Sequence, residues 1–456
     1  MNGAHKQSIE EQEKAKFSFS GATLYGINAV IGSGIFLLPQ KIYSGLGPAS
    51  LAVMFGVAIL VMLLSACLAE TAGYFDKNGG AMQYSKAAFG DFVGFNVGIL
   101  GWAVTVIAWA AMLAGFAKIF IITFPAFEGY NLPISIGMLI LLSLMNIAGL
   151  KTSKMFTLTA TVAKLIPIVL FSLFAIFFIS GGVSKGNFTP FLQLESGTNL
   201  FSSISSTAVY IFYGFIGFET MSIVAGEMRN PEKNVPRAIL GSISIVSVLY
   251  MLIIAGTIAM LGGRIMQTGA PVQDAFVEMI GPIGAPLVSY GALISIAGLN
   301  IGESIMVPRF GAALATEKLL PEGLGKTNSK NAPVIAIIIS GIFAFLLLLS
   351  GSFETLATFS VVFRFFQYIP TALAAIKLRK MYPDKKVTFR VPFGPVIPVL
   401  AVVVSILMIA GDNMMNFVWG AIGLVIASGL YFVFIASGLY FVFHGDKLHK
   451  SKALPH

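Results

Sequence analysis

Residues 24–38 read LYGINAVIGSGIFLL, an apolar stretch with Gly32-Ser33-Gly34 at its centre. Glycine costs about 1 kcal/mol per site in a helix relative to alanine. Lipid offers the backbone no hydrogen-bond partners, so non-helical backbone at membrane depth is tolerated only where it lines a cavity or is buried in protein. The stretch therefore predicts a membrane helix that is interrupted at a binding site. Close helix packing at the glycines is the alternative explanation.

The rest of the chain has the composition of a polytopic helical membrane protein. Of its 456 residues, 56% are hydrophobic and only 11% are charged. Apolar runs of about 18 residues or more recur along it, each long enough to cross a bilayer core of about 30 Å. The runs are too long for the strands of a membrane barrel, which alternate and have about ten residues. We expect twelve spans, at roughly 18–44, 47–72, 92–121, 132–150, 155–181, 199–225, 238–262, 283–308, 332–350, 354–376, 392–411 and 414–443.

Lysine and arginine placement predicts the orientation of these spans. Of the 29 Lys and Arg residues, Lys164 and Arg364 lie well inside predicted spans, and four lie at or beyond the span ends on the side opposite the N-terminus; the remaining 23 share the side of the N-terminus. Because cytoplasmic loops carry the excess of Lys and Arg, both termini are expected in the cytoplasm of a multi-pass protein of the cell membrane. The net charge of +9 then faces anionic lipid, and no nucleic-acid partner is expected.

The spans suggest a division of the chain, with one local irregularity. The nine residues IASGLYFVF occur twice in succession, at 426–434 and 435–443, which lengthens the last apolar run. The expected parts are a cytoplasmic tail (1–17), a ten-helix core (18–376, with repeats of about 18–181 and 199–376), a cytoplasmic loop (377–391), helices eleven and twelve (392–443) and a second cytoplasmic tail (444–456).

A second glycine-containing stretch lies at the matching place in the second half. Residues 210–219 read YIFYGFIGFE, with Gly214 and Gly217 in the middle of the sixth predicted span. Two five-helix repeats of inverted topology would each begin with an interrupted helix, which is span one and span six here. Each interruption frees N–H groups on one side and C=O groups on the other. Together they suit a zwitterion, with N–H groups for a carboxylate and C=O groups for an ammonium.

The residues give little support for catalysis, metal binding, nucleotide binding or channel conduction. The single cysteine, Cys67, lies in an apolar run, and the four histidines lie near the ends of the chain, so no catalytic or metal-binding cluster is predicted in the spans. The chain has no G-x-x-x-x-G-K-[ST] phosphate loop, no channel filter repeat and no ring of like charge. We expect a transporter without cofactor, metal or catalytic residue. A channel and a membrane-embedded enzyme are disfavoured alternatives.

Five groups of residues carry a resemblance to a known family. They are GSGIF (32–36), Gly79-Gly80 with Tyr84 and Phe89-Gly90, GFIGFET…GEMRNPEKNVPRA (214–238), LLPEGLGKTNSKNAPVIAI (319–337) and LRKMYPDKKVTFRVPF (378–393). With them the chain resembles the amino acid–polyamine–organocation (APC) transporter superfamily. The resemblance implies an all-α polytopic membrane protein with twelve transmembrane helices. It implies a LeuT-like 5+5 inverted repeat with discontinuous helices 1 and 6, plus two accessory helices.

The resemblance also implies how a substrate is held. Beside Gly32, the backbone N–H groups of Ser33 and Gly34 would meet its carboxylate. Backbone carbonyls would meet its ammonium; they belong to Val30, Tyr213, Gly214 and Ile216. Aromatic gates are expected at Phe36, Phe218 and Tyr368, and other aromatics near the site are Trp102, Trp109 and Tyr213. For any single aromatic residue in a span, lipid or core packing is the plainer explanation.

Ionisable residues inside membrane spans are candidates for function. Lys164 lies well inside the fifth span, where the resemblance implies an ammonium in place of the ion of sodium-coupled relatives. It would tie the broken first helix to span eight through free carbonyls and take part in coupling, with a snorkelling lysine as the alternative. A proton is therefore a candidate coupling ion, and sodium dependence is not expected. Glu219 follows the second break, and the resemblance implies a gating or pH-sensing acid; a carboxylate that caps the next half-helix is the alternative.

Two further ionisable residues leave the choice of substrate open. Glu303 in span eight falls where relatives place a residue of the side-chain pocket, so its carboxylate would favour a cationic side chain or an amine. An ion pair between Glu303 and Arg364 of span ten would instead neutralise it. The sequence thus predicts a secondary active transporter of amino acids that works by alternating access. Exchange of an amino acid, for instance for its amine, and proton-coupled symport both remain open.

Overall fold

The structure is a computed structural model that describes residues 18–75, 80–149, 154–194, 197–219, 228, 230–387 and 389–436. Its first-half α-helices are α2 (Phe19–Val30), α3 (Gly34–Leu37), α4 (Pro39–Leu46), α5 (Ser50–Ala72), α6 (Gly80–Phe89), α7 (Asp91–Thr123), α8 (Asn131–Ile147) and α9 (Lys154–Ser184). Those of the second half are α10 (Leu200–Phe215), α12 (Pro231–Leu261), α13 (Pro271–Ile280), α14 (Gly284–Thr316), α15 (Val334–Ser350), α16 (Phe353–Met381), α17 (Val396–Gly411) and α18 (Met414–Ala436). Short 3₁₀ turns join some of them: η1 (Gly47–Ala49), η2 (Pro125–Phe127), η4 (Gly262–Gln267) and η5 (Glu322–Gly325).

The expected class of fold is confirmed. The described residues are mainly helical, and seven helical stretches among them are long and apolar enough to cross a membrane. Four shorter apolar helices accompany these: α8, α10, α15 and α17. The chain is thus a polytopic helical membrane protein, while the count of twelve spans stays a prediction. The structure adds α6 and α13, two ten-residue helices that are too short to be recognised as spans.

The first predicted span is broken, as the glycines indicated. Helix α2 begins at an N-cap, Ser18, whose hydroxyl accepts a hydrogen bond from the N–H of Gly21. It ends at Val30, and α3 begins only at Gly34. Leu38 then separates α3 from α4, which starts with proline at its first position, where the missing N–H is not needed.

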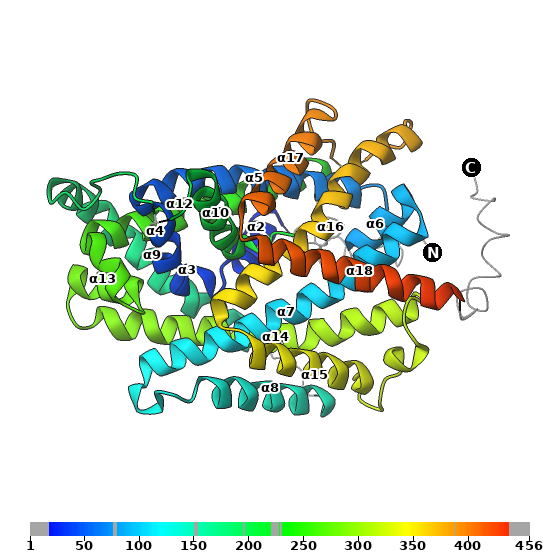
Figure 1. The fold of residues 1–456 in the computed structure, drawn as a ribbon, viewed down its shortest axis with the longest axis horizontal. Helices are drawn as coiled ribbons and strands as arrows, with labels where there is room; N and C mark the ends of the chain where they lie inside the picture. Colours follow the sequence, from blue (N-terminus) through cyan, green and yellow to red (C-terminus); the bar gives the residue numbers. More distant parts are fainter. Residues whose placement is uncertain are drawn as a thin grey trace, which may run out of the picture.

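Two groups of helices enclose the interrupted segments (Figure 1). Helices α7, α8, α14 and α15 lie side by side, with α8 and α15 forming the outermost layer at the bottom of the view. On the other side, α12 packs against α2, α5 and α9, and α10 packs against α5. Helix α16 touches both groups through α7, α5 and α10. Helices of the first half also touch helices of the second half, α3 with α10, α5 with α12, α7 with α14 and α8 with α15.

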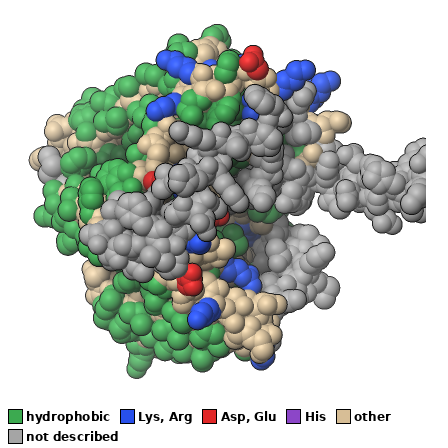
Figure 2. Space-filling view, turned by 90° about the vertical axis from the view of Figure 1, so that its right-hand side faces the viewer, with side chains coloured by type: hydrophobic (Ala, Val, Ile, Leu, Met, Phe, Trp, Pro, Cys, Tyr) green, Lys and Arg blue, Asp and Glu red, His purple; other side chains and the backbone are tan. Residues whose placement is uncertain are grey.

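One end of the molecule carries many Lys and Arg side chains (Figure 2). At this end a buried carboxylate joins α5 to α16. Arg379 donates to both oxygens of Glu70, which is fully buried, and the Val391 N–H donates to the same carboxylate at 2.7 Å. We call this group the Glu70 clasp. Of the duplicated nine-residue stretch, the first copy lies in α18 and most of the second lies outside the described residues.

Candidate functional site

The two interruptions meet in the interior. A Cβ atom built on Gly34 would lie 3.0 Å from the Cα of Gly214 and 3.2 Å from the ring of Tyr213. The hydroxyls of Ser33 and Tyr213 are 3.2 Å apart and hydrogen-bonded. Only glycine at 34 allows the two backbones to come this close. The glycines of both breaks therefore serve close approach, and they do so at a point where helix α2 has ended.

The second interruption is visible up to the edge of the described segment. Helix α10 ends at Phe215, and Ile216–Glu219 form turns. Gly217 has φ of +111° and packs on α2, where an added Cβ would be 2.8 Å from the carbonyl carbon of Ala29. Residues 220–227, where the second half of the sixth span was expected, lie outside the described residues.

The first break offers main-chain groups of both kinds. Within the described chain, the N–H groups of Ser33 and Gly34 have no hydrogen-bond partner, while the Ser33 carbonyl accepts from Phe36 and Leu37. On the other side of the break, the Lys164 ammonium donates to the carbonyls of Asn28 (2.6 Å) and Ile31 (2.9 Å).

Lys164 is almost fully buried, with 3% of its surface exposed. It projects from α9 to the C-terminal end of α2, where backbone carbonyls have lost their intrahelical partners. The expected bond to the broken first helix is thus present, while both hydrogen bonds that Lys164 makes in the described chain go to this helix segment and neither goes to span eight. An ammonium that lies at the break is not snorkelling to the membrane surface.

Tyr250 of α12 was not anticipated from the sequence. Its buried hydroxyl lies 3.0 Å from the carbonyl oxygen of Gly214 and 3.4 Å from that of Val30, and it also hydrogen-bonds the Gly32 backbone. Val30 and Gly214 supply two of the four carbonyls expected to meet a substrate ammonium. A third, that of Tyr213, accepts the N–H of Ile216 at 3.2 Å. The only signal in the sequence was a tyrosine in the middle of an apolar span.

The ion pair of Arg364 differs from the one considered from the sequence. Arg364 Nη1 donates to Glu219 Oε1, and the second oxygen of Glu219 accepts the N–H of Gly217 at 3.0 Å. No ion pair between Arg364 and Glu303 is formed in the described chain; the two interact only electrostatically. Glu219 is the last residue of the turn that follows α10, and this turn brings it to α16.

The expected gate residues are all buried, but they do not form one group. Phe218 and Tyr368 have ring centroids 5.1 Å apart and pack with Phe212 and Phe365 of α10 and α16. Phe36 is buried on α3, away from these ring contacts. Beside it, Leu37 lies against Gly115 of α7, where an added Cβ would be 3.1 Å from its methyl group. The α3 side of the break is therefore closed by packed side chains.

The buried aromatic residues of α7 contribute unpaired donors. Trp102 and Trp109 lie two turns apart and are both buried, and neither indole N–H has a hydrogen-bond partner in the structure. The Trp102 ring packs against Gly311 of α14 and Phe343 of α15, which agrees with a packing role.

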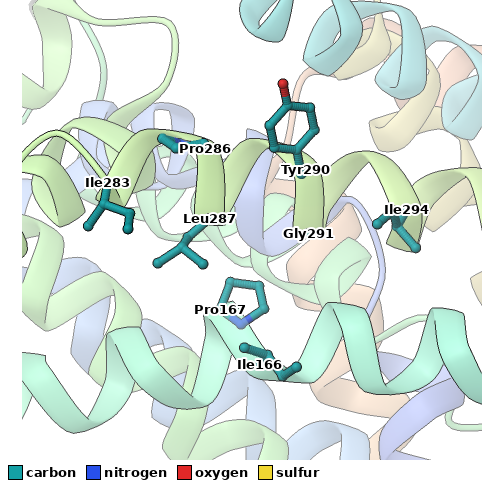
Figure 3. A pocket seen from close by; sticks show the side chains of 8 residues that line it. All are labelled: Ile166, Pro167, Ile283, Pro286, Leu287, Tyr290, Gly291 and Ile294. Carbon is teal, nitrogen blue, oxygen red and sulfur yellow. The ribbon is translucent and has the colours of Figure 1, made fainter.

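A separate apolar groove of about 390 Å³ lies between α9 and α14 (Figure 3). Figure 3 shows Ile283 and Leu287 pointing towards Ile166 and Pro167, and Tyr290 pointing away. Its lining holds no charged residue, and several of its side chains face outwards. This is a lipid-facing surface and lacks the polar groups of the break.

Comparison with known proteins identifies the family of the chain. Residues 17–443 match the model of a family described as amino acid permease. The chain belongs to the amino acid permease family. This family match agrees with the APC resemblance, and the chain is a membrane transporter and not an enzyme.

Named relatives cover most of the chain. It is 30% identical to an uncharacterized transporter of Mycobacterium tuberculosis, over 86% of each chain. It is 29% identical to a serine/threonine exchanger of Bacillus subtilis, over 82% of this chain and 86% of that one. It is 27% identical to a methylthioribose transporter of the same organism, over 94% and 96%. Their named substrates differ, so similarity supports transport without selecting a substrate.

Proposed function

We propose that this permease is a secondary active transporter of amino acids that works by alternating access. The observation that carries the proposal is the contact between the two interruptions, where Gly34 packs on Gly214 and Ser33 bonds Tyr213. Interrupted helices that meet inside a membrane protein bring N–H and C=O groups to one place, and an α-amino acid carries the matching carboxylate and ammonium.

The proposed substrate position uses the main chain. The carboxylate accepts the free N–H groups of Ser33 and Gly34, next to Gly32. The ammonium donates to carbonyls of the two breaks, namely those of Val30, Tyr213, Gly214 and Ile216. Tyr250 already donates to this set, so a substrate ammonium bound there takes over the bond that the hydroxyl makes with Gly214.

The proposed architecture is a LeuT-like 5+5 inverted repeat of about 18–181 and 199–376, followed by helices eleven and twelve, in a chain of twelve spans. Contacts between corresponding helices support it, since α5 touches α12, α7 touches α14 and α8 touches α15. Both termini are proposed to be cytoplasmic, because the excess of Lys and Arg lies on that side.

Alternating access requires the closed half of the site to open. Leu37 on α3 must then separate from α7, while Phe36, Phe218 and Tyr368 act as gates. Lys164 and Glu219 are the coupling residues of the proposal, because each binds an interrupted segment through a charge. The coupling ion is a proton and not sodium, since an ammonium already binds the carbonyls of the first break.

Counterflow in proteoliposomes tests the function. Vesicles containing the purified protein are preloaded with one unlabelled amino acid and given a labelled one outside, with decarboxylated amines and methylthioribose in the same panel. We expect uptake that requires a substrate on the opposite side or a proton gradient. Uptake that needs neither indicates a channel, and exchange confined to methylthioribose refutes the substrate class.

Two glycine variants provide a matched comparison. Gly34→Val places methyl groups at the contact with Gly214 and should abolish uptake. Gly137→Val on α8, where an added Cβ meets no atom within 4 Å, should retain it. Equal uptake by both variants would contradict a substrate site at the break.

A further inference from the structure

Three ionisable side chains lie together beside the break: Glu219, Arg364 and Glu303. We call them the buried charge cluster. Arg364 is 7% exposed and is paired with Glu219, whose other oxygen accepts the N–H of Gly217. Glu303 lies close enough to interact electrostatically with both of them and with Tyr213. With all three ionised, the cluster carries one net negative charge, whichever carboxylate the guanidinium contacts.

Glu303 is the member without a bond. In the described chain it forms neither an ion pair nor a hydrogen bond, although it is half-buried on a membrane helix. Leu299 lies one turn earlier on α14, and its methyl group is 3.5 Å from the place of a Cβ on Gly32. Residues four apart share one face of a helix. The Glu303 carboxyl therefore belongs to the face of α14 that meets the first break.

No other described charge compensates Glu303. The only charged groups that act on it are Arg364 of α16 and Glu219 after α10, and the other titratable groups near them are Tyr213 and Tyr368. The described part of α2 contains no charged residue, and the Lys164 ammonium is bound to α2 carbonyls. The Tyr368 hydroxyl of α16 interacts with Arg364 and Glu219 and carries no charge that could balance Glu303. The cluster thus has an excess charge that no described group compensates.

An uncompensated charge in a low-dielectric interior is unfavourable and is removed by a partner ion or by a proton. We infer that Glu303 makes every loaded site carry the same charge: a cationic amino acid binds with Glu303 ionised, and a neutral amino acid binds together with one proton on Glu303. The ammonium of a substrate side chain and a proton can therefore each neutralise the Glu303 carboxylate, one in place of the other. The inference rests on the proposed function and names the substrate class and the coupling rule of that same site.

The test measures binding as a function of pH in detergent-solubilised protein. Dissociation constants of leucine and lysine are obtained from ligand-dependent thermal stabilisation between pH 5 and 9. Raising the pH removes the proton that leucine requires, so leucine binding should weaken by about tenfold per pH unit above the ionisation of Glu303. Lysine binding should not weaken over the same range. This comparison needs no variant, and equal pH dependence of the two ligands would overturn the inference.

Variants assign the effect to Glu303. In Glu303→Gln, leucine binding should lose its pH dependence and lysine binding should weaken at least about tenfold, because the carboxylate partner is gone. Glu303→Asp should restore the pH dependence, and Glu322→Gln at an exposed position of η5 should behave as wild type. Unchanged lysine affinity in Glu303→Gln overturns the inference but leaves amino acid binding intact. If the wild type binds no amino acid, the proposed function fails and the charge rule fails with it.

Discussion

The Lys164 ammonium lies 2.9 Å from the carbonyl oxygen of Ile31, the first residue beyond the end of α2. It also donates to Asn28, one turn earlier. A helix that stops in the middle of a membrane leaves carbonyls without partners, and lipid supplies none. Lys164 supplies them from α9. The charge thus stabilises an interruption that the backbone alone would not maintain.

Lys164→Ala should reduce counterflow at least about tenfold while folded protein is still obtained. The variant leaves the Ile31 and Asn28 carbonyls without their donor. This loss should lower the free energy of unfolding by about 1–3 kcal/mol. Uptake rate and melting temperature are measured on the same preparation. Wild-type rates would remove Lys164 from the mechanism.

Gly217→Ala should destabilise the protein by about 1–3 kcal/mol. Gly217 has φ of +111°, which side chains disfavour, and its added Cβ would meet the Ala29 carbonyl of α2. Gly56→Ala on α5 is the matched control, because its Cβ would meet nothing within 4 Å. Thermal unfolding in detergent should separate the two variants, with Gly56→Ala close to wild type. Similar melting temperatures would show that the second break is not held against α2.

Particular residues show what the sequence could predict. The Gly-Ser-Gly and Gly-Phe-Ile-Gly stretches predicted both interruptions, because two such stretches at matching places in the two halves favour broken helices over close packing alone. The family resemblance implied that the Lys164 ammonium would bind carbonyls of the first helix, and the structure shows these bonds. Counting residues along the helix gave only the depth of Lys164 in its span.

The partner of Arg364 could not be predicted in this way. Counting residues along each span gives the depth of Glu219, Glu303 and Arg364 in the membrane. It does not give the direction in which each side chain points. Glu219 lies in a turn in which the helical period is lost, so its direction depends on the fold of that turn. Tyr250 was missed for a related reason. An aromatic residue in an apolar span usually packs, and only the structure shows its hydroxyl beside the two breaks.

Tyr250→Phe tests whether that hydroxyl holds the place of the substrate ammonium. Loss of its bond to Gly214 should lower the free energy of unfolding, measured without added amino acid, by about 1–2 kcal/mol. A bound amino acid supplies a replacement donor, so its stabilising effect on melting temperature should be larger in the variant than in wild type. Titration with leucine, followed by thermal unfolding, measures both quantities. Equal stabilisation of the two proteins would mean that the ammonium does not bind at these carbonyls.

Breaking the Glu70 clasp should lower the free energy of unfolding by an amount that depends on which partner is removed. Arg379→Met leaves the fully buried Glu70 carboxylate with only the N–H of Val391, so we expect a loss of about 3–5 kcal/mol. Replacing both residues with methionine should cost less than Arg379→Met alone, because no unpaired charge remains. Lys380→Met, at the exposed neighbouring position, is the control and should leave thermal unfolding unchanged. If Arg379→Met melts at the same temperature as Lys380→Met, the ion pair does not hold the ends of α5 and α16 together.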